Sequence, residues 1–241
     1  MPVRHRADLS ALLSELLGAG VTFALREPGE VPVAALRPIE AEAVRSAVEP
    51  RRLEMAAGRD AAREALSRLG IEDATLPVAP GGAPAWPEGV VGSITHTRTL
   101  CIAAVARRSD LLAIGLDAES DEPLDAALWE IIGTEVELGE LARLGGEEAG
   151  ARARAMFCAK EAAYKCQYTV TGALLDFGDL RVEWPDPGGG DAGRGGSAVR
   201  RRVRARCAPL PGRGSHPGLV GRAGGHVIAV AALSPSRAAR R

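Results

Sequence analysis

The stretch Met156–Tyr168, MFCAKEAAYKCQY, holds both lysines of the 241-residue chain, Lys160 and Lys165; every other fixed side-chain cation is an arginine. Lysine carries a compact, mobile ammonium, whereas arginine carries a flat fork suited to bidentate contacts. Two lysines in one short segment therefore favour a site that needs compact charge. In a helix, Phe157, Glu161 and Lys165 recur every four residues and share one face. The alternative is a surface helix with an ordinary Glu–Lys pair.

Composition and charge are those of a soluble globular protein. Hydrophobic residues make up 46% of the chain and charged residues 25%, which is ordinary for that class. The formal net charge of −1 argues against a dedicated nucleic-acid binder. No apolar run approaches the ~18 residues of a membrane helix, and no signal-peptide core follows the N-terminus. The four cysteines lack a C-x-x-C pair, which favours reduced thiols. We expect a cytoplasmic monomer with neither nucleic acid nor membrane as a partner.

Hydrophobic periodicity predicts an α+β protein. Helices are expected over residues 8–17, 40–48, 51–69, 125–132, 135–144 and 147–168, and short strands over 21–25, 90–97, 174–177, 180–183 and 226–233. The apolar runs 100–106 and 111–116 flank a polar turn and predict a β-hairpin. Residues 199–207 alternate arginine with valine and alanine, which favours an exposed edge strand over a nucleic-acid surface. The low-complexity tract 185–197, PDPGGGDAGRGGS, predicts a disordered hairpin tip.

Acidic residues follow directly after one of these apolar strands. Asp117 and Glu119 are two positions apart, so in a continuing strand they point to one face. Like charges that close repel, and a hard divalent cation relieves the repulsion. Glu161 of the central helix offers a third oxygen ligand, and this donor set suits Mg²⁺. A solvated strand end is the alternative.

Polar and basic groups near the middle of the chain suit phosphate. His96 lies in GSITH with Ser93 nearby, and Arg51 and Arg59 belong to a set of arginines along one predicted helix. A structural histidine and a solvated helix face are the alternatives. Ser93 lacks the G-x-S-x-G setting of a nucleophile. Carboxylates, lysines and arginines without a covalent nucleophile favour phosphoryl-type transfer, which relies on positioning and charge stabilisation.

Four motifs in order give the chain a family resemblance. They are RRLEMAAGRDAAREAL at Arg51–Leu66, WPEGVVGSITH at Trp86–His96, IGLDAE at Ile114–Glu119 and FCAKEAAYK at Phe157–Lys165. Together they resemble the 4′-phosphopantetheinyl transferases of the long single-chain, surfactin and enterobactin type, and most of all the enterobactin-type branch of actinobacteria. The resemblance implies a pseudo-twofold fold of two similar α+β halves, 1–112 and 113–241, with coenzyme A between them and 185–197 as an insertion.

The resemblance also implies the reaction. Members of this family move the phosphopantetheine arm of coenzyme A to a serine of an apo acyl, peptidyl or aryl carrier protein and release 3′,5′-adenosine bisphosphate. By motif position, Asp117, Glu119 and Glu161 would hold Mg²⁺. Glu161 would also take the serine proton, and Lys165 would neutralise the α-phosphate. Polyketide, peptide, fatty-acid and siderophore pathways all remain open for the carrier.

The resemblance assigns the contacts to coenzyme A to residues of both halves. The phosphates would meet Lys160, His96 and Ser93, while Arg51 and Arg59 would bind the 3′-phosphate and pyrophosphate side. One departure stands out, because Leu76–Trp86, LPVAPGGAPAW, has no basic residue where this branch commonly has one. The alternatives are a non-enzymatic relative that binds coenzyme A or a carrier protein, and an Mg²⁺-dependent phosphohydrolase.

Overall fold

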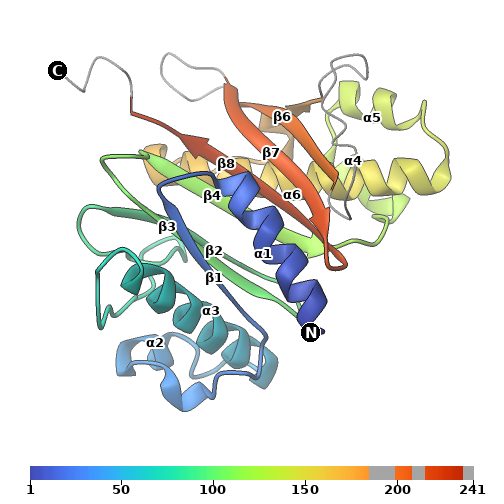
Figure 1. The fold of residues 1–241 in the computed structure, drawn as a ribbon. Helices are drawn as coiled ribbons and strands as arrows, with labels where there is room; N and C mark the ends of the chain where they lie inside the picture. The colour runs from blue at the N-terminus through green and yellow to red at the C-terminus, as the bar shows by residue number, and fades with distance from the viewer. Residues whose placement is uncertain (185–198, 208–214, 236–241) are drawn as a thin grey trace. The chain divides into compact units, whose positions relative to one another are not determined.

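The computed structural model describes residues 1–184, 199–207 and 215–235 (Figure 1). The chain divides into two compact units. Unit 1 is built mainly from Ala19–Ile114, and unit 2 from Pro2–Gly18 and Gly115–Leu233. Both units combine helices with a sheet, so the α+β prediction is confirmed. No helix within the described ranges has the length and apolarity needed to cross a bilayer.

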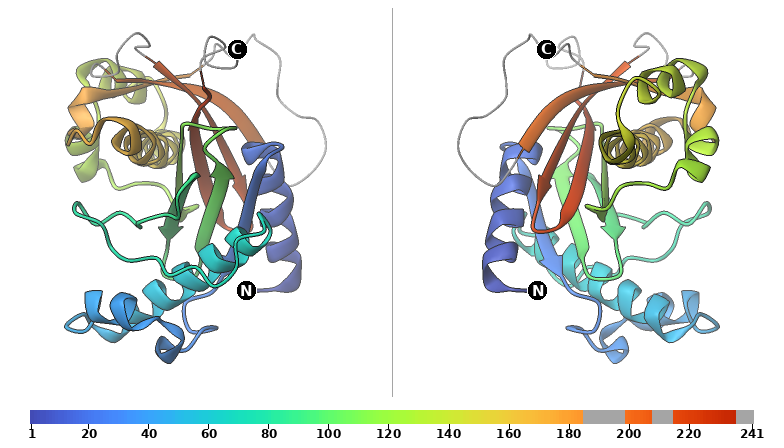
Figure 2. Two further views of the ribbon diagram at one scale, coloured as in Figure 1. Left: turned by 90° about the vertical axis from the view of Figure 1, so that its left-hand side faces the viewer. Right: turned by 90° about the vertical axis from the view of Figure 1, so that its right-hand side faces the viewer.

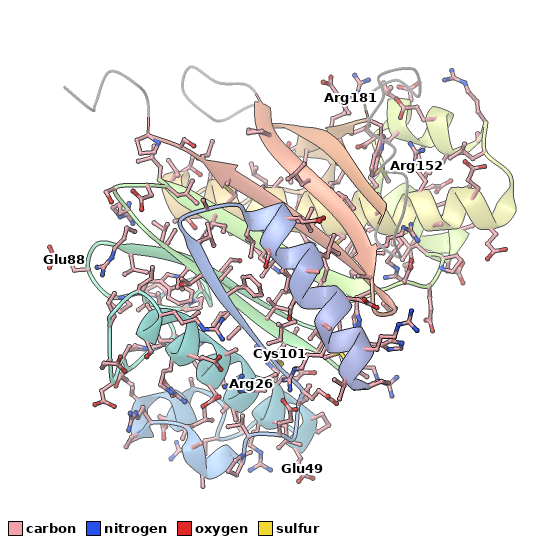
Figure 3. All side chains as sticks on the ribbon, viewed as in Figure 1. Arg26, Glu49, Glu88, Cys101, Arg152 and Arg181 are labelled. Atoms are coloured by element: carbon pink, nitrogen blue, oxygen red, sulfur yellow. The ribbon has the colours of Figure 1, made fainter. Side chains whose placement is uncertain are left out.

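Unit 1 packs one long helix on a three-stranded antiparallel sheet. The sheet has the order β1-β3-β2, with β1 at Val21–Arg26, β3 at Cys101–Arg107 and β2 at Val90–His96. Helix α3, Glu49–Ser67, places buried alanines against the sheet. The short elements η1, Val33–Ala35, and α2, Pro38–Ala43, precede it. Arg26 of β1, labelled in Figure 3, ion-pairs with Asp60 and Glu64 and so ties the strand to α3.

Unit 2 has a five-stranded sheet of order β4-β8-β7-β6-β5. Its strands are β4, Ala113–Ser120; β5, Leu180–Glu183; β6, Val199–Cys207; β7, Ser215–Ala223; and β8, His226–Leu233. Its helices are α1, Val3–Leu17; η2, Ala126–Leu128; α4, Trp129–Ile132; α5, Glu135–Leu141; α6, Gly146–Thr171; and η3, Phe177–Asp179.

Helices α1 and α6 cover opposite faces of this sheet (Figure 2). Two neighbouring residues of β7 contact the two helices, because alternate positions in a strand point to opposite faces of the sheet. Gly221 leaves room for Leu12 of α1, while Arg222 donates to the Ala151 carbonyl of α6 at 2.8 Å. Four buried leucines of α1 make this contact surface: Leu9, Leu12, Leu13 and Leu16.

Two predictions of strand pairing are wrong. Residues 100–106 and 111–116 form no hairpin, because β3 lies in the sheet of unit 1 and β4 in the five-stranded sheet. The chain changes units between Ile114 and Gly115. Strand β6 is not an edge strand, because it pairs with both β5 and β7. Strand β5 takes the edge position instead.

Other boundaries also differ from the sequence prediction. Helix α1 belongs to unit 2 and not to the expected half 1–112, because its leucines are buried against β7 and β8. The expected strand 174–177 is irregular and leads into η3. Strand β7, with its Pro and two Gly residues, was missed. The tract 185–197 lies outside the described residues.

Gly115 lets β4 and α6 approach each other unusually closely. A Cβ atom at this position would lie 1.9 Å from the Ala162 carbonyl oxygen and 2.6 Å from the Cys166 nitrogen. Both atoms belong to the helix backbone, so no side-chain rotation can relieve such a clash. Any larger residue must therefore push β4 and α6 apart.

We predict that Gly115→Ala lowers the free energy of unfolding by at least about 2 kcal/mol, because overpacking against rigid backbone is costly. The matched control is Gly139→Ala in α5, where a Cβ meets nothing within 4 Å; it should be neutral or stabilising. Urea denaturation of both variants measures the difference. Equal stabilities would contradict the close approach.

Candidate functional site

Two carboxylates of β4 lie on one face of the strand, as predicted. Asp117 and Glu119 alternate with Ala118, which is buried on the other face. Asp117 is only 5% exposed. Burial and the charge of Asp117 raise the pKa of Glu119, although Arg154 and Lys165 oppose the shift. The two carboxylates therefore repel each other in a partly dehydrated place.

Helix α6 brings a carboxylate and an ammonium to the same place. The Lys165 ammonium donates to Asp117 Oδ1 at 2.6 Å and to the Leu116 carbonyl at 3.2 Å. Glu161 lies one turn earlier, and burial and the charge of Asp117 raise its pKa while Lys165 opposes the shift. The structure thus brings Asp117, Glu119, Glu161 and Lys165 together within unit 2.

Arg154 is a member of this cluster that the sequence analysis did not select. It ion-pairs with Glu119 at 3.1 Å and also donates to the Glu122 carbonyl at 3.0 Å. The available signal is its spacing, because Arg154 precedes Glu161 by seven residues and so lies on the same helix face. Chemically, Arg154 neutralises one of the β4 carboxylates.

The donor set fits Mg²⁺, although its members are not arranged around a metal position. Within the described parts of the chain, no three His, Cys, Asp or Glu side chains are grouped so that they could hold a metal ion. The ion pairs explain this, since Lys165 binds Asp117 and Arg154 binds Glu119. Burial, followed by the charge of Asp117, raises the pKa of both Glu119 and Glu161, and a hard divalent cation would relieve the repulsion part of these shifts.

Lys160 does not fit the expected contact with coenzyme A phosphates. Its side chain is 0% exposed. Its ammonium donates to Glu137 Oε2 at 2.7 Å and to the carbonyls of Ile132 at 2.7 Å and Phe177 at 3.0 Å. An ammonium has three N–H donors, and all three are occupied. Lys160 therefore holds the protein together in this structure and offers no donor to a ligand.

Glu137, the partner of Lys160, is a buried junction that the sequence analysis missed. Besides Lys160, it accepts from the Thr134 backbone and hydroxyl at 2.8 Å each and from the Val182 nitrogen at 2.7 Å. The T-x-x-E pattern of 134–137 does announce a capping box. That pattern does not predict that Glu137 is buried or that it pairs with a lysine. The junction links α4, α5, α6 and β5.

In unit 1, the structure brings Arg51 and His96 together. Arg51 Nη1 lies 2.5 Å from His96 Nε2 and 3.2 Å from Glu54 Oε2. His96 Nδ1 lies 3.4 Å from the same carboxylate. The Arg51 side chain is 47% exposed and that of His96 39%. Both groups are open enough to meet a ligand.

Arg59 and Ser93 have different surroundings. Arg59 is 4% exposed, and its Nε donates to the Leu76 carbonyl at 2.9 Å. Burial lowers its pKa to about 10; Glu40 opposes the shift, and Arg63 and Arg51 add to it. An arginine in such surroundings attracts anions.

The structure does not group Ser93 with His96. Ile94 packs toward Gly58 of α3, so strand alternation places Ser93 on the opposite face of β2 and His96 on the same face as Ile94. Ser93 is also 5% exposed. The resemblance assigns both residues to coenzyme A phosphates, and strand alternation lets them reach a ligand only from opposite faces of β2.

Comparisons with known proteins agree on one family. Residues 39–106 match the 4′-phosphopantetheinyl transferase N-terminal domain, and residues 113–231 match the 4′-phosphopantetheinyl transferase superfamily. The transferase Svp of Streptomyces mobaraensis is 41% identical over 65% of this chain and 65% of its own length. PptT of Mycobacterium tuberculosis is 34% identical over 69% of this chain and 71% of its own. Npt of Nocardia iowensis is 33% identical over 76% and 82%.

We predict that Lys160→Met lowers the free energy of unfolding by about 3–5 kcal/mol, because it leaves the buried Glu137 carboxylate without its opposite charge. Adding Glu137→Gln removes the unpaired negative charge, so the double variant should lose less free energy of unfolding than the sum of the losses of the two single variants. Urea denaturation of the four proteins measures this coupling. A loss below about 1 kcal/mol for Lys160→Met would contradict the buried pair.

Proposed function

Because the chain belongs to the 4′-phosphopantetheinyl transferase family, we propose that it transfers the phosphopantetheine arm of coenzyme A to a serine of an apo carrier protein. The product released is 3′,5′-adenosine bisphosphate. The observation that carries the proposal is the cluster of unit 2, in which Lys165, Asp117, Glu119 and Glu161 interact. It has the groups that cleavage of a pyrophosphate needs, and the Cys158 thiol beside Asp117 is a poor nucleophile because burial raises its pKa.

Glu161 is the base that we assign to the carrier serine. A serine hydroxyl is a weak nucleophile, and a carboxylate that accepts its proton during attack makes it effective. The raised pKa of Glu161 brings its basicity closer to neutral pH, where a general base works best. Lys165 carries the compact cation that offsets charge developing on the leaving phosphate. These two residues are one helical turn apart, so one helix positions both.

Asp117, Glu119 and Glu161 are the ligands that we assign to Mg²⁺. When bound, the ion would polarise the phosphate oxygens and neutralise their charge. Lys165 binds Oδ1 of Asp117 and Arg154 binds Oε2 of Glu119, so a bound cation would compete with these ion pairs for the carboxylate charge. Weakening of its ion pair would let Lys165 interact with a phosphate.

Unit 1 supplies the arginines that we assign to the phosphates at the nucleotide end. Arg51 and His96 are partly exposed and in contact, and Arg59 is a buried cation beside further arginines. Their concentration offsets the lack of a basic residue in Leu76–Trp86. Ser93 and Lys160 carry no assignment, for the geometric reasons given above.

The partner is an apo carrier protein, which we identify by class only. Its pathway is open, siderophore assembly included. A cytoplasmic monomer, with no nucleic acid or membrane as partner, stays a prediction.

We predict that an apo carrier protein incubated with this protein, coenzyme A and Mg²⁺ gains about 340 Da, and that EDTA abolishes the gain because it removes the cation that neutralises the phosphates. Intact-mass spectrometry with several carriers measures it. Coenzyme A binding without any gain would identify a non-enzymatic relative. Cleavage of coenzyme A without attachment would identify a hydrolase.

We predict that Glu161→Gln slows transfer at least about 100-fold, because general bases contribute rate factors of about 10²–10⁴. Coenzyme A affinity, measured by calorimetry at saturating Mg²⁺, should change less than about threefold, since arginines and Lys165 carry most of the phosphate attraction. The control is Glu147→Gln, an exposed carboxylate in the first turn of the same helix. Turnover of Glu161→Gln at the wild-type rate would remove the base assignment.

A further inference from the structure

Glu40 is a charged side chain with no contact to solvent, and the sequence motifs give it no role. It lies in the short helix α2 and is 0% exposed. Its Oε1 accepts from Arg63 Nη1 at 3.1 Å and from the Leu76 nitrogen at 2.9 Å. Its Oε2 accepts from the same Arg63 atom at 3.0 Å and from the Arg37 nitrogen at 2.9 Å. Both oxygens are needed to satisfy these donors.

The backbone of Leu76 is held from two sides. Its N–H donates to Glu40, and its carbonyl accepts from Arg59 Nε at 2.9 Å. Its side chain is 0% exposed and belongs to the core beside α3. Leu76 is thus a fixed link between a buried carboxylate and a buried guanidinium, at the root of the loop that lacks basic residues.

Arg59 has little else to fix it. Across the described ranges, its hydrogen bond to Leu76 is the one the structure records, and it enters no ion pair. Glu40 is the negative charge that acts on it, against the positive charges of Arg63 and Arg51. A buried guanidinium normally uses several of its five N–H groups. The remaining donors of Arg59 are available to phosphate oxygens.

We infer that Glu40 is a positioning residue for the phosphate-binding arginine Arg59, acting through the Leu76 peptide and Arg63. The inference rests on the proposed function, in which Arg59 binds a phosphate of coenzyme A. Glu40 itself touches no substrate. It orients the cation that compensates for the missing basic residue of the Leu76–Trp86 loop. Its effect therefore falls on coenzyme A binding and leaves the chemistry on α6 unchanged.

Two simpler roles make different predictions. If Glu40 only stabilises the fold, its loss lowers stability and leaves the affinity of the folded protein unchanged. If Glu40 only balances charge, its neutralisation strengthens the positive field around Arg59, so coenzyme A binds more tightly. A positioning role predicts weaker binding, because glutamine has one acceptor oxygen where Glu40 uses two.

The test is Glu40→Gln, measured by carrier-loading kinetics and by calorimetry with coenzyme A. We expect KM and Kd for coenzyme A to rise at least about fivefold while kcat stays within about twofold, since only an ordering effect on binding is lost. The matched control is Glu64→Gln on α3, whose carboxylate pairs with Arg26 and Arg68. It should leave both constants unchanged.

Unchanged or tighter coenzyme A binding by Glu40→Gln would overturn the inference. If that variant does not fold, Glu40→Asp decides, because it keeps the charge but is too short to reach both backbone donors; an unchanged KM would again overturn the inference. Failure of the proposed function gives a different result, namely no transfer to any carrier by the wild-type protein, whether or not it binds coenzyme A. Melting temperatures of all variants separate stability from affinity.

Discussion

The close contact between β4 and α6 is the constraint on which the candidate site depends. Gly115 puts no side chain between strand and helix at the point of closest approach, and two residues later Asp117 contacts Lys165 of α6 at 2.6 Å. Glu119 follows on the same strand face, and Glu161 precedes Lys165 by one helical turn. A wider separation would leave Asp117 too far from Glu161 to raise the pKa of that carboxyl. The chemistry of unit 2 is therefore set by a backbone contact.

The two lysines that first marked this helix differ in role because they lie on different helix faces. Lys160 enters a cage of three oxygens and is fully buried, whereas Lys165 remains partly exposed beside the carboxylates. Compact charge explains both, since a planar guanidinium fits a small three-oxygen cage poorly. The rarity of lysine therefore indicates where compact charge is needed. It does not distinguish the ammonium of Lys160, which has three protein partners, from that of Lys165, which stays accessible.

Sequence periodicity predicted most helices and the local geometry of the site, because both depend on residues a few positions apart. The spacing of Asp117 and Glu119 on a strand, and of Glu161 and Lys165 on a helix, fixes their relative directions. Pairing between strands depends on residues far apart in the chain. The apolar runs of β3 and β4 indicate that each strand is buried, but they do not indicate to which sheet each strand belongs. For the same reason Glu40, Glu137 and Arg154, whose partners are distant or buried, were not found.

The two buried glutamates show that the units resemble each other in construction. Glu40 and Glu137 each occupy the third position of a short helix and accept the N–H of the residue before that helix, at 2.9 and 2.8 Å. Each also accepts a backbone N–H from a distant segment. Each binds a cation on the following long helix, 23 residues further along in both cases, Arg63 or Lys160. Such matching contacts at equal spacing support two halves of common design, although their sequences show no visible repeat. In each unit, a buried carboxylate binds the long helix that carries the candidate ligand-binding residues. The ligand-binding residues themselves differ between the two units.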